Sequence, residues 1–261
     1  MFGIDLEIVL VLLFMVPIVI LVIYLSQKPR LQERKLNRLT QAWLLEQNFE
    51  KLANDDHDLM EVLKHNPATR NDLGRTSVKA AYVSRKDWGT VWVLDFLAIN
   101  KSRTASTSSR PSGPTQEHVC LISNQALNLP EVTVIPSQKL MKSIVGFAER
   151  LHQAIQGSNQ NFTLRFPEDP AFADSFMVLS QDEMATRELL SAMVRTFMVD
   201  LRPLNFYFGC TGQNFAIHYG HYIGPDQALS MINQAEIFTH IFRGETSQVE
   251  QLIEQAISRV G

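Results

Sequence analysis

Residues 77–99 read Ser77-Val-Lys-Ala-Ala-Tyr-Val-Ser-Arg-Lys-Asp-Trp-Gly-Thr-Val-Trp-Val-Leu-Asp-Phe-Leu-Ala-Ile99. Both ends of this segment are rich in Val, Tyr, Trp and Phe, which strands favour. Between them, Lys86-Asp-Trp-Gly89 is typical of a hairpin turn. The segment therefore predicts two antiparallel strands, Ser77–Ser84 and Thr90–Ile99.

The second of these strands also predicts which way its side chains point. Successive side chains of a strand point to opposite faces of the sheet. We expect the set that is apolar throughout to face the core: Trp92, Leu94, Phe96 and Ala98. The alternate set contains Asp95, which we therefore expect on the wetter face.

The same periodicities and turn signals extend outward along the chain. Further strands are predicted at Glu117–Ser123, Val132–Ile135, Asn161–Phe166, Phe176–Leu179, Leu204–Cys210 and Phe215–Ile223. Helices are predicted at Leu31–Leu52, Leu59–Lys64, Gln138–Gln156, from the capping box Ser180–Glu183 to Asp200, from Pro225, and from Ser247 to the end. We expect Met184, Leu189, Leu190, Met193 and Phe197 on the buried face of the helix that ends at Asp200. Because the strands come in hairpins and never alternate singly with helices, the fold class is α+β with antiparallel sheet.

The start of the chain predicts a membrane anchor. Ile8–Leu25 is eighteen residues without a charged side chain, which as a helix measures about 27 Å against a hydrocarbon core of ~30 Å. A cleaved secretion signal is the main alternative, but the start carries Asp5 and Glu7 and no basic residue, and no small-residue cleavage site follows. The predicted fold is thus an N-terminal transmembrane helix followed by a soluble domain of antiparallel hairpins and packed helices.

Basic residues follow the anchor at once: Lys28, Arg30, Arg34, Lys35 and Arg38. The positive-inside rule then places the bulk of the chain in the cytoplasm and the N-terminus outside. The expected localisation is the bacterial inner membrane, crossed once, with the lipid bilayer as the partner of residues 1–27. The basic cluster either fixes this topology alone or also contacts anionic headgroups.

We divide the chain into an anchor (1–27), a juxtamembrane basic and amphipathic helix (28–58) and a cytosolic α+β domain (59–261). Within the last, residues 101–116 are Ser, Thr, Arg, Pro and Gly with no large apolar side chain, which predicts a flexible hairpin loop. Net charge is −3 with nearly balanced signs, which argues against a nucleic-acid partner. The two cysteines, Cys120 and Cys210, lie far apart in apolar surroundings and are predicted to be buried free thiols.

Three groups of side chains are candidates for a metal site or for acid–base catalysis. His218 and His221 are three apart on a predicted strand and therefore face opposite sides, which disfavours a metal site. His57 among Asp55, Asp56 and Asp58 is better explained as a polar turn. Glu168, Asp169 and Asp174 could do acid–base work, but they lie among prolines where Asp is a common turn residue.

One part of the chain resembles a known group of proteins. The resemblance rests on Leu127-Asn-Leu-Pro130, Phe162, Phe166-Pro-Glu-Asp-Pro-Ala-Phe172 and Phe176-Met-Val-Leu-Ser-Gln-Asp-Glu-Met-Ala-Thr-Arg-Glu-Leu-Leu190. Over residues 75–225 the chain resembles an uncharacterised bacterial family of membrane-anchored proteins. The resemblance implies an N-terminal hydrophobic helix with a soluble α+β domain, and it implies no activity, cofactor or site residue.

The function expected from these observations is a non-enzymatic interaction or scaffold module at the inner membrane, with an unidentified protein partner and no cofactor or metal. Two alternatives stay open. One is a membrane-tethered enzyme that uses Glu168, Asp169 or Asp182 with Arg187. The other is a module that binds anionic lipid through the basic residues between Lys28 and Arg38.

Overall fold

The structure, a computed structural model, describes residues 32, 34–53, 55–67, 69, 76–98, 115–137, 162–201, 206–219, 223–245 and 247–249. The predicted hairpin lies within its sheet as β2 (Thr76–Lys86) and β3 (Gly89–Ala98), paired antiparallel from end to end. The turn is held from outside, because the side-chain amide of Asn124 donates to the backbone oxygen of Trp88 at 2.7 Å.

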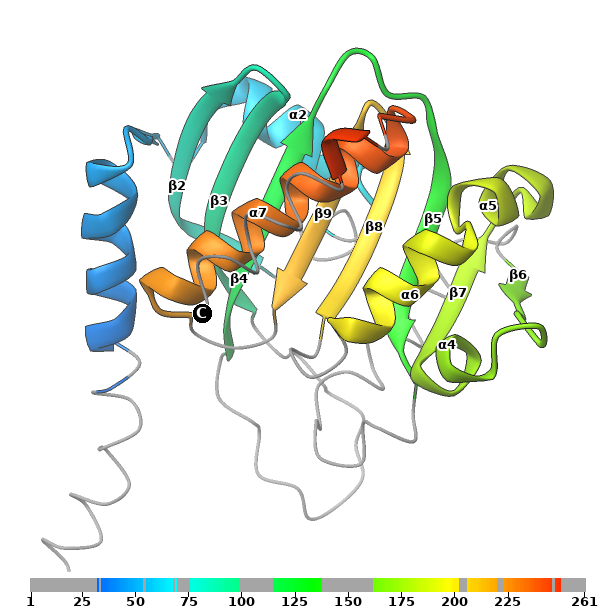
Figure 1. The fold of residues 1–261 in the computed structure, drawn as a ribbon. Helices are drawn as coiled ribbons and strands as arrows, with labels where there is room; N and C mark the ends of the chain where they lie inside the picture. The colour runs from blue at the N-terminus through cyan, green and yellow to red at the C-terminus, as the bar shows by residue number, and fades with distance from the viewer. Residues whose placement is uncertain are drawn as a thin grey trace, which may run out of the picture.

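All nine strands of the described residues join one sheet, in the order β1-β2-β3-β4-β9-β8-β5-β7-β6 (Figure 1). The other strands are β1 (Glu50–Leu52), β4 (Thr115–Ser123), β5 (Leu129–Pro136), β6 (Phe162–Leu164), β7 (Phe176–Ser180), β8 (Phe206–Gly212) and β9 (Asn214–Tyr219). Every pair in the sheet is antiparallel, which confirms the predicted α+β class.

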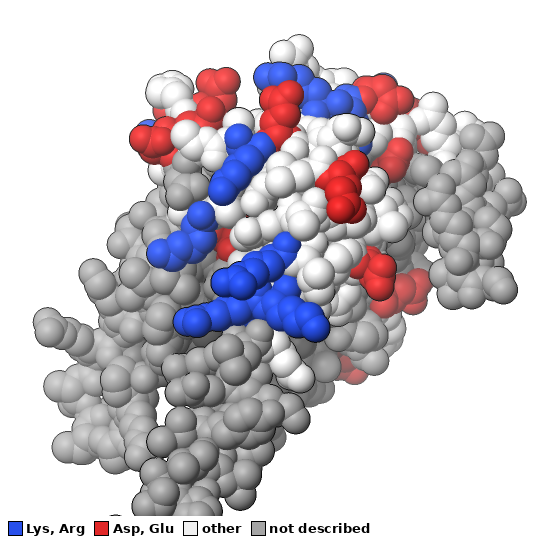
Figure 2. Space-filling view, turned by 90° about the vertical axis from the view of Figure 1, so that its left-hand side faces the viewer, with Lys and Arg blue, Asp and Glu red and all other residues white. Residues whose placement is uncertain are grey.

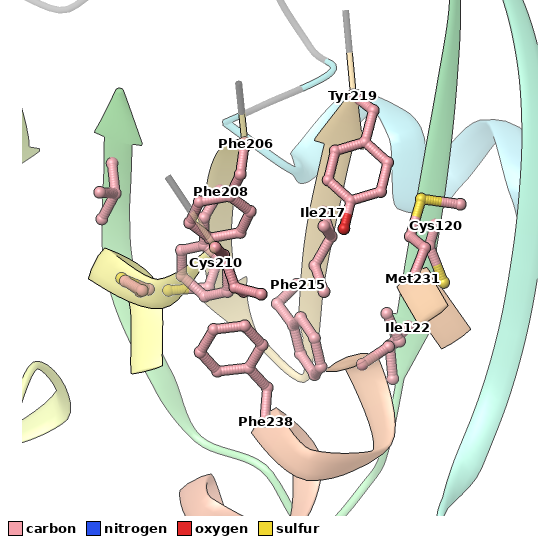
Figure 3. Close-up of a cluster of buried hydrophobic side chains, with 14 of the residues drawn as sticks. Cys120, Ile122, Phe206, Phe208, Cys210, Phe215, Ile217, Tyr219, Met231 and Phe238 are labelled. Atoms are coloured by element: carbon pink, nitrogen blue, oxygen red, sulfur yellow. The ribbon is translucent and has the colours of Figure 1, made fainter. Parts of the chain in front are cut away.

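One face of the sheet carries the main core. The helices α6 (Ala192–Asp200) and α7 (Pro225–Phe242) lie across it (Figure 1). A helix over residues 34–46, which stands beside β2 in this view, packs Leu44 and Trp43 into the same core. The prediction that α7 starts after Gly224 is confirmed, and its buried residues Ala228, Met231, Ala235 and Phe238 recur at helical spacing. Figure 3 shows Phe238 of α7 beside Phe208 of β8 and Phe215 of β9, and Met231 of α7 near Cys120 of β4. Both cysteines are buried in this core as free thiols, as predicted.

The opposite face carries a second apolar cluster under α2 (His57–His65). Leu59 and Leu63 of α2 pack there with Trp92 and Leu94. The strand β3 is therefore buried on both sides, and the prediction that Asp95 lies on a wet face is wrong. Asp95 is 4% exposed and lies on the main core face, where helix 34–46 covers it.

Several predicted elements differ in their bounds. The helix expected over 31–52 ends at residue 46, and the chain then forms β1 at the sheet edge. The helix expected from Ser180 to Asp200 is two helices, α5 (Glu183–Leu189) and α6, separated at Leu190 and Ser191. Met184 of α5, at the edge of the fold, is 85% exposed instead of buried, and Met193 in the first turn of α6 is 49% exposed.

Other elements were missed or cannot be compared. The segment between Phe166 and Phe176 contains a short helix, α4 (Pro170–Ser175), that the sequence did not predict. The strand β4 begins at Thr115, so the predicted loop ends two residues early. Residues 101–114, the predicted helix 138–156 and the chain after residue 249 lie outside the described residues.

The predicted membrane span requires a correction. Among the described residues no helix is both long enough and apolar enough to cross a bilayer. The longest of these helices, α7, has 18 residues but carries Asp226, Gln234, Glu236 and His240. This finding contradicts the transmembrane part of the predicted fold class and the predicted single-pass inner-membrane localisation. The residues assigned to the anchor, 1–27, lie outside the described residues.

Gly89 is a position where a side chain would not fit. Its φ of +148° is unfavourable for other residues, and an added Cβ would lie 2.9 Å from the backbone oxygen of Ser123. Gly89→Ala is expected to lower the free energy of unfolding by about 2 kcal/mol through strain and contact. The control is Gly212→Ala, where φ is +54° but no atom lies within 4 Å, and the expected loss is about 1 kcal/mol. Urea denaturation of both variants measures the difference, and equal losses would contradict the contact argument.

Candidate functional site

Two arginines and one aromatic ring organise the end of the sheet near β6 and β7. The guanidinium carbons of Arg187 in α5 and Arg195 in α6 lie 5.0 Å and 5.1 Å from the centre of the Phe166 ring. Such cation–π contacts contribute about 0.5–2 kcal/mol each, depending on burial. The ring and the two cations thus join α5 and α6 to the segment that leads into α4.

Of the three carboxylates predicted as acid–base candidates, Glu168 and Asp169 lie in this cluster as ion-pair partners. The third, Asp174, is an exposed residue of α4. Asp169 accepts from Arg195 Nε at 3.0 Å and from the backbone N–H of Phe172 at 3.1 Å, so it caps α4. The Arg195 hydrogen bond lowers the pKa of the Asp169 carboxyl, against a smaller effect of burial. Glu168 lies 3.5 Å from Arg187 and 3.8 Å from Arg195.

Asp182 does not join the cluster as a reacting group. Its side chain accepts from the backbone N–H of Ala185 at 3.0 Å and is the N-cap of α5, a place that the sequence assigned to Ser180. Ser180 instead ends β7, and its hydroxyl bonds to Thr186 at 2.6 Å. Glu183 pairs with Arg187 at 2.8 Å, as expected for residues four apart on a helix. These contacts stabilise the start of α5 and its packing on the end of β7.

Removing the cap tests this structural role. Asp182→Ala is expected to cost about 1 kcal/mol of unfolding free energy, because one N–H at the start of α5 loses its acceptor. Glu188→Ala, an exposed change on the same helix, should stay within about 0.5 kcal/mol. Thermal melts of both variants provide the measurement, and an unchanged melting temperature for Asp182→Ala would refute the capping role.

The histidine candidates are also explained by the fold. His218 in β9 is 5% exposed, and its ring meets Tyr207 edge-on with centroids 5.7 Å apart. His221 lies outside the described residues. Asp56 is the N-cap of α2 and accepts from Leu59 N–H at 3.0 Å, while His57 and Asp58 are exposed. Within the described ranges, no three His, Cys, Asp or Glu side chains are placed to hold a metal ion.

A buried polar row that the sequence did not predict crosses the main core face. Asp95, His118 and Tyr219 are direct neighbours across β3, β4 and β9, and each is under 5% exposed. Directly opposite residues on antiparallel strands share a face. Burial raises the pKa of the Tyr219 hydroxyl, and Tyr219 donates a hydrogen bond to Gln234 of α7. No local sequence motif predicts this row, because its three residues lie on three separate strands.

Asp95 of this row and the backbone just before α7 hold helix 34–46 in place. Asn37 donates to Asp95 Oδ2 at 2.7 Å, and Thr40 donates to the backbone oxygen of Ile223 at 2.7 Å. Leu44, 2% exposed, packs in the main core beside these bonds. Two hydrogen bonds and one buried leucine therefore fix which side of this helix points inward.

The opposite side of the same helix is exposed and basic. Arg34, Lys35 and Arg38 are exposed, while Lys28 and Arg30 lie outside the described residues. Leu39 is 47% exposed and Leu45 is 53% exposed. Figure 2 views the side of the molecule where this helix lies and shows lysine and arginine side chains close together with uncharged atoms between them. We call the exposed residues Arg34, Lys35, Arg38, Leu39, Ala42 and Leu45 the outward helix face.

Comparison with known proteins identifies a structure of similar fold but no family to which the chain can be assigned. Neither the family models nor the curated proteins compared with this chain give a match. Among solved structures, the mycobacterial trehalose monomycolate transport factor A is similar, with a TM-score of 0.53 and 12% sequence identity. The alignment covers 81% of this chain and 94% of that chain. At this identity the likeness shows a shared fold alone, and the resemblance to an uncharacterised bacterial family stays a prediction.

Proposed function

We propose that this chain is a non-enzymatic interaction module whose contact surface is the outward helix face. The observation that carries the proposal is the way helix 34–46 is held. Its inner side is bonded at Asn37 to Asp95 of the sheet and at Thr40 to the backbone of Ile223 just before α7, while Leu39 and Leu45 stay about half exposed on the outer side. Large apolar side chains exposed together on a rigid element are typical of an interaction site.

The candidate acids give less support to catalysis. Asp169 and Asp182 cap helices, and Glu168 and Glu183 pair with arginines. An enzyme that used these groups would have to break the contacts that hold α4 and α5. The protein of similar fold is named a transport factor, and a name of that kind agrees with a role outside catalysis.

Site-specific photo-crosslinking tests the proposal in cells that make the full chain. A photoreactive amino acid at position 45 should give discrete adducts, because this position lies on the outward helix face. The matched control is position 184, where Met184 is 85% exposed on α5, away from helix 34–46. Adducts from position 45 that position 184 lacks would support the proposal. Equal labelling from the two positions would refute it.

A further inference from the structure

The outward helix face mixes cations and leucines on one surface. At about 100° per residue, Arg34, Leu45 and Arg38 lie within about 40° of one another around the helix axis. Lys35, Ala42 and Leu39 fill about the next 100°. The cations lie in the first part of the described helix, and the exposed acid Glu46 at its last residue falls on the same face, at about 120° from Arg34.

This mixture narrows the kind of surface that would cover the helix. An acidic protein segment would neutralise the three cations but has no need of Leu39 and Leu45. An apolar protein groove would bury the leucines but would offer Arg34, Lys35 and Arg38 no anionic partner. The surface of an anionic bilayer provides phosphates at the headgroups for the cations and acyl chains beneath them for the leucines. Long basic side chains can extend to the headgroups while the apolar side chains enter the region between the headgroups and the acyl chains.

From the position and mixture of these side chains we infer that the outward helix face binds the surface of an anionic lipid bilayer. This inference rests on the proposed function and names the partner of the same surface. Because Asn37, Thr40 and Leu44 hold the other side of the helix, the helix lies flat on the membrane surface with the sheet behind it. Binding then orients the whole domain relative to the bilayer.

Vesicle flotation with the full chain tests the inference. The measured quantity is the ratio of binding to vesicles of mixed phosphatidylglycerol and phosphatidylcholine over binding to phosphatidylcholine alone. Any binding that does not depend on lipid charge enters both terms, so the ratio isolates the charge-dependent part. The variant Lys35→Gln/Arg38→Gln should lower this ratio by about 30-fold, since each basic residue near an anionic surface is worth roughly a factor of five.

The matched control removes two cations elsewhere. Lys64→Gln/Arg165→Gln makes the same charge change at exposed residues outside helix 34–46 and should leave the ratio within about twofold. A second variant, Leu39→Ser/Leu45→Ser, should reduce binding to the mixed vesicles as well, because the leucines enter the lipid. Matched melting temperatures for the variants and the parent chain show that the fold is intact.

Each outcome decides the inference. Equal ratios for the Lys35/Arg38 variant and the Lys64/Arg165 control would overturn it. Unchanged binding of the Leu39→Ser/Leu45→Ser variant to the mixed vesicles would also overturn it, because the leucines would then not enter the lipid. If crosslinking from position 45 yields a protein adduct while the vesicle ratio does not change, the lipid assignment fails and the interaction module stands. If position 45 yields no specific adduct and the ratio does not change, both fail.

Discussion

Replacing Phe238 by alanine is expected to lower the free energy of unfolding by about 3–5 kcal/mol, the range for a buried aromatic cut back to a methyl group. Phe238 of α7 is 0% exposed and meets five other rings, with centroid distances of 5.0–6.3 Å. These rings come from α6, β8, β9 and α7 itself: Phe197, Phe206, Phe208, Phe215 and Phe242. Phe238 thus joins two helices to the middle of the sheet (Figure 3).

Equilibrium urea denaturation followed by far-UV circular dichroism measures this loss. The control is Leu229→Ala on the same helix, where the side chain is 40% exposed and the expected loss is under about 1 kcal/mol. A loss for Phe238→Ala no larger than that of the control would mean that α7 does not close the core in the way described.

The second large effect is expected at Arg195. Its side chain is 11% exposed, and it donates to Asp169 Oδ2 at 3.0 Å and to the backbone oxygen of Leu190 at 2.9 Å. Arg195→Met keeps much of the apolar volume beside Phe166 but leaves both acceptors without this donor. We expect a loss of about 3 kcal/mol at neutral pH, since hydrogen bonds to charged groups contribute roughly 1.5–3 kcal/mol and a second bond is lost with the first.

The pH dependence gives this prediction a signature of its own. Arg195 lowers the pKa of Asp169 in the folded state, below the unfolded value of about 3.9. The stabilisation is therefore present above that unfolded pKa and disappears as pH falls through the folded pKa. The difference in unfolding free energy between parent and Arg195→Met should shrink in this acidic range.

Arg187→Met is the matched control, because Arg187 lies against the same ring but is 39% exposed. Exposed ion pairs contribute about 0–1 kcal/mol, so this variant should lose far less stability at neutral pH. Equal losses for the two variants, or a difference from the parent that does not change with pH, would contradict the role given to the Arg195–Asp169 pair.

The amino-acid sequence by itself determined the local elements of this protein. Alternation and turn residues predicted the hairpin of β2 and β3, and Gly224-Pro225 predicted the start of α7. These features depend on backbone preferences and side-chain spacing within a few residues, which a sequence displays directly. The acidic residues at the start of α5 were likewise recognised as helix-end residues, with Asp182 in place of Ser180 as the cap.

Only the tertiary structure decided which surfaces are buried and which are left exposed. Asp95 has a polar side chain in an apolar strand, yet it is buried because Asn37, 58 residues earlier in the chain, supplies a hydrogen bond. The helix containing Leu39, Leu44 and Leu45 is apolar on more than one side, so its periodicity could not select the side that Thr40 and Asn37 fix inward. Burial is settled by contacts between residues far apart in the chain, and local patterns carry no record of those contacts.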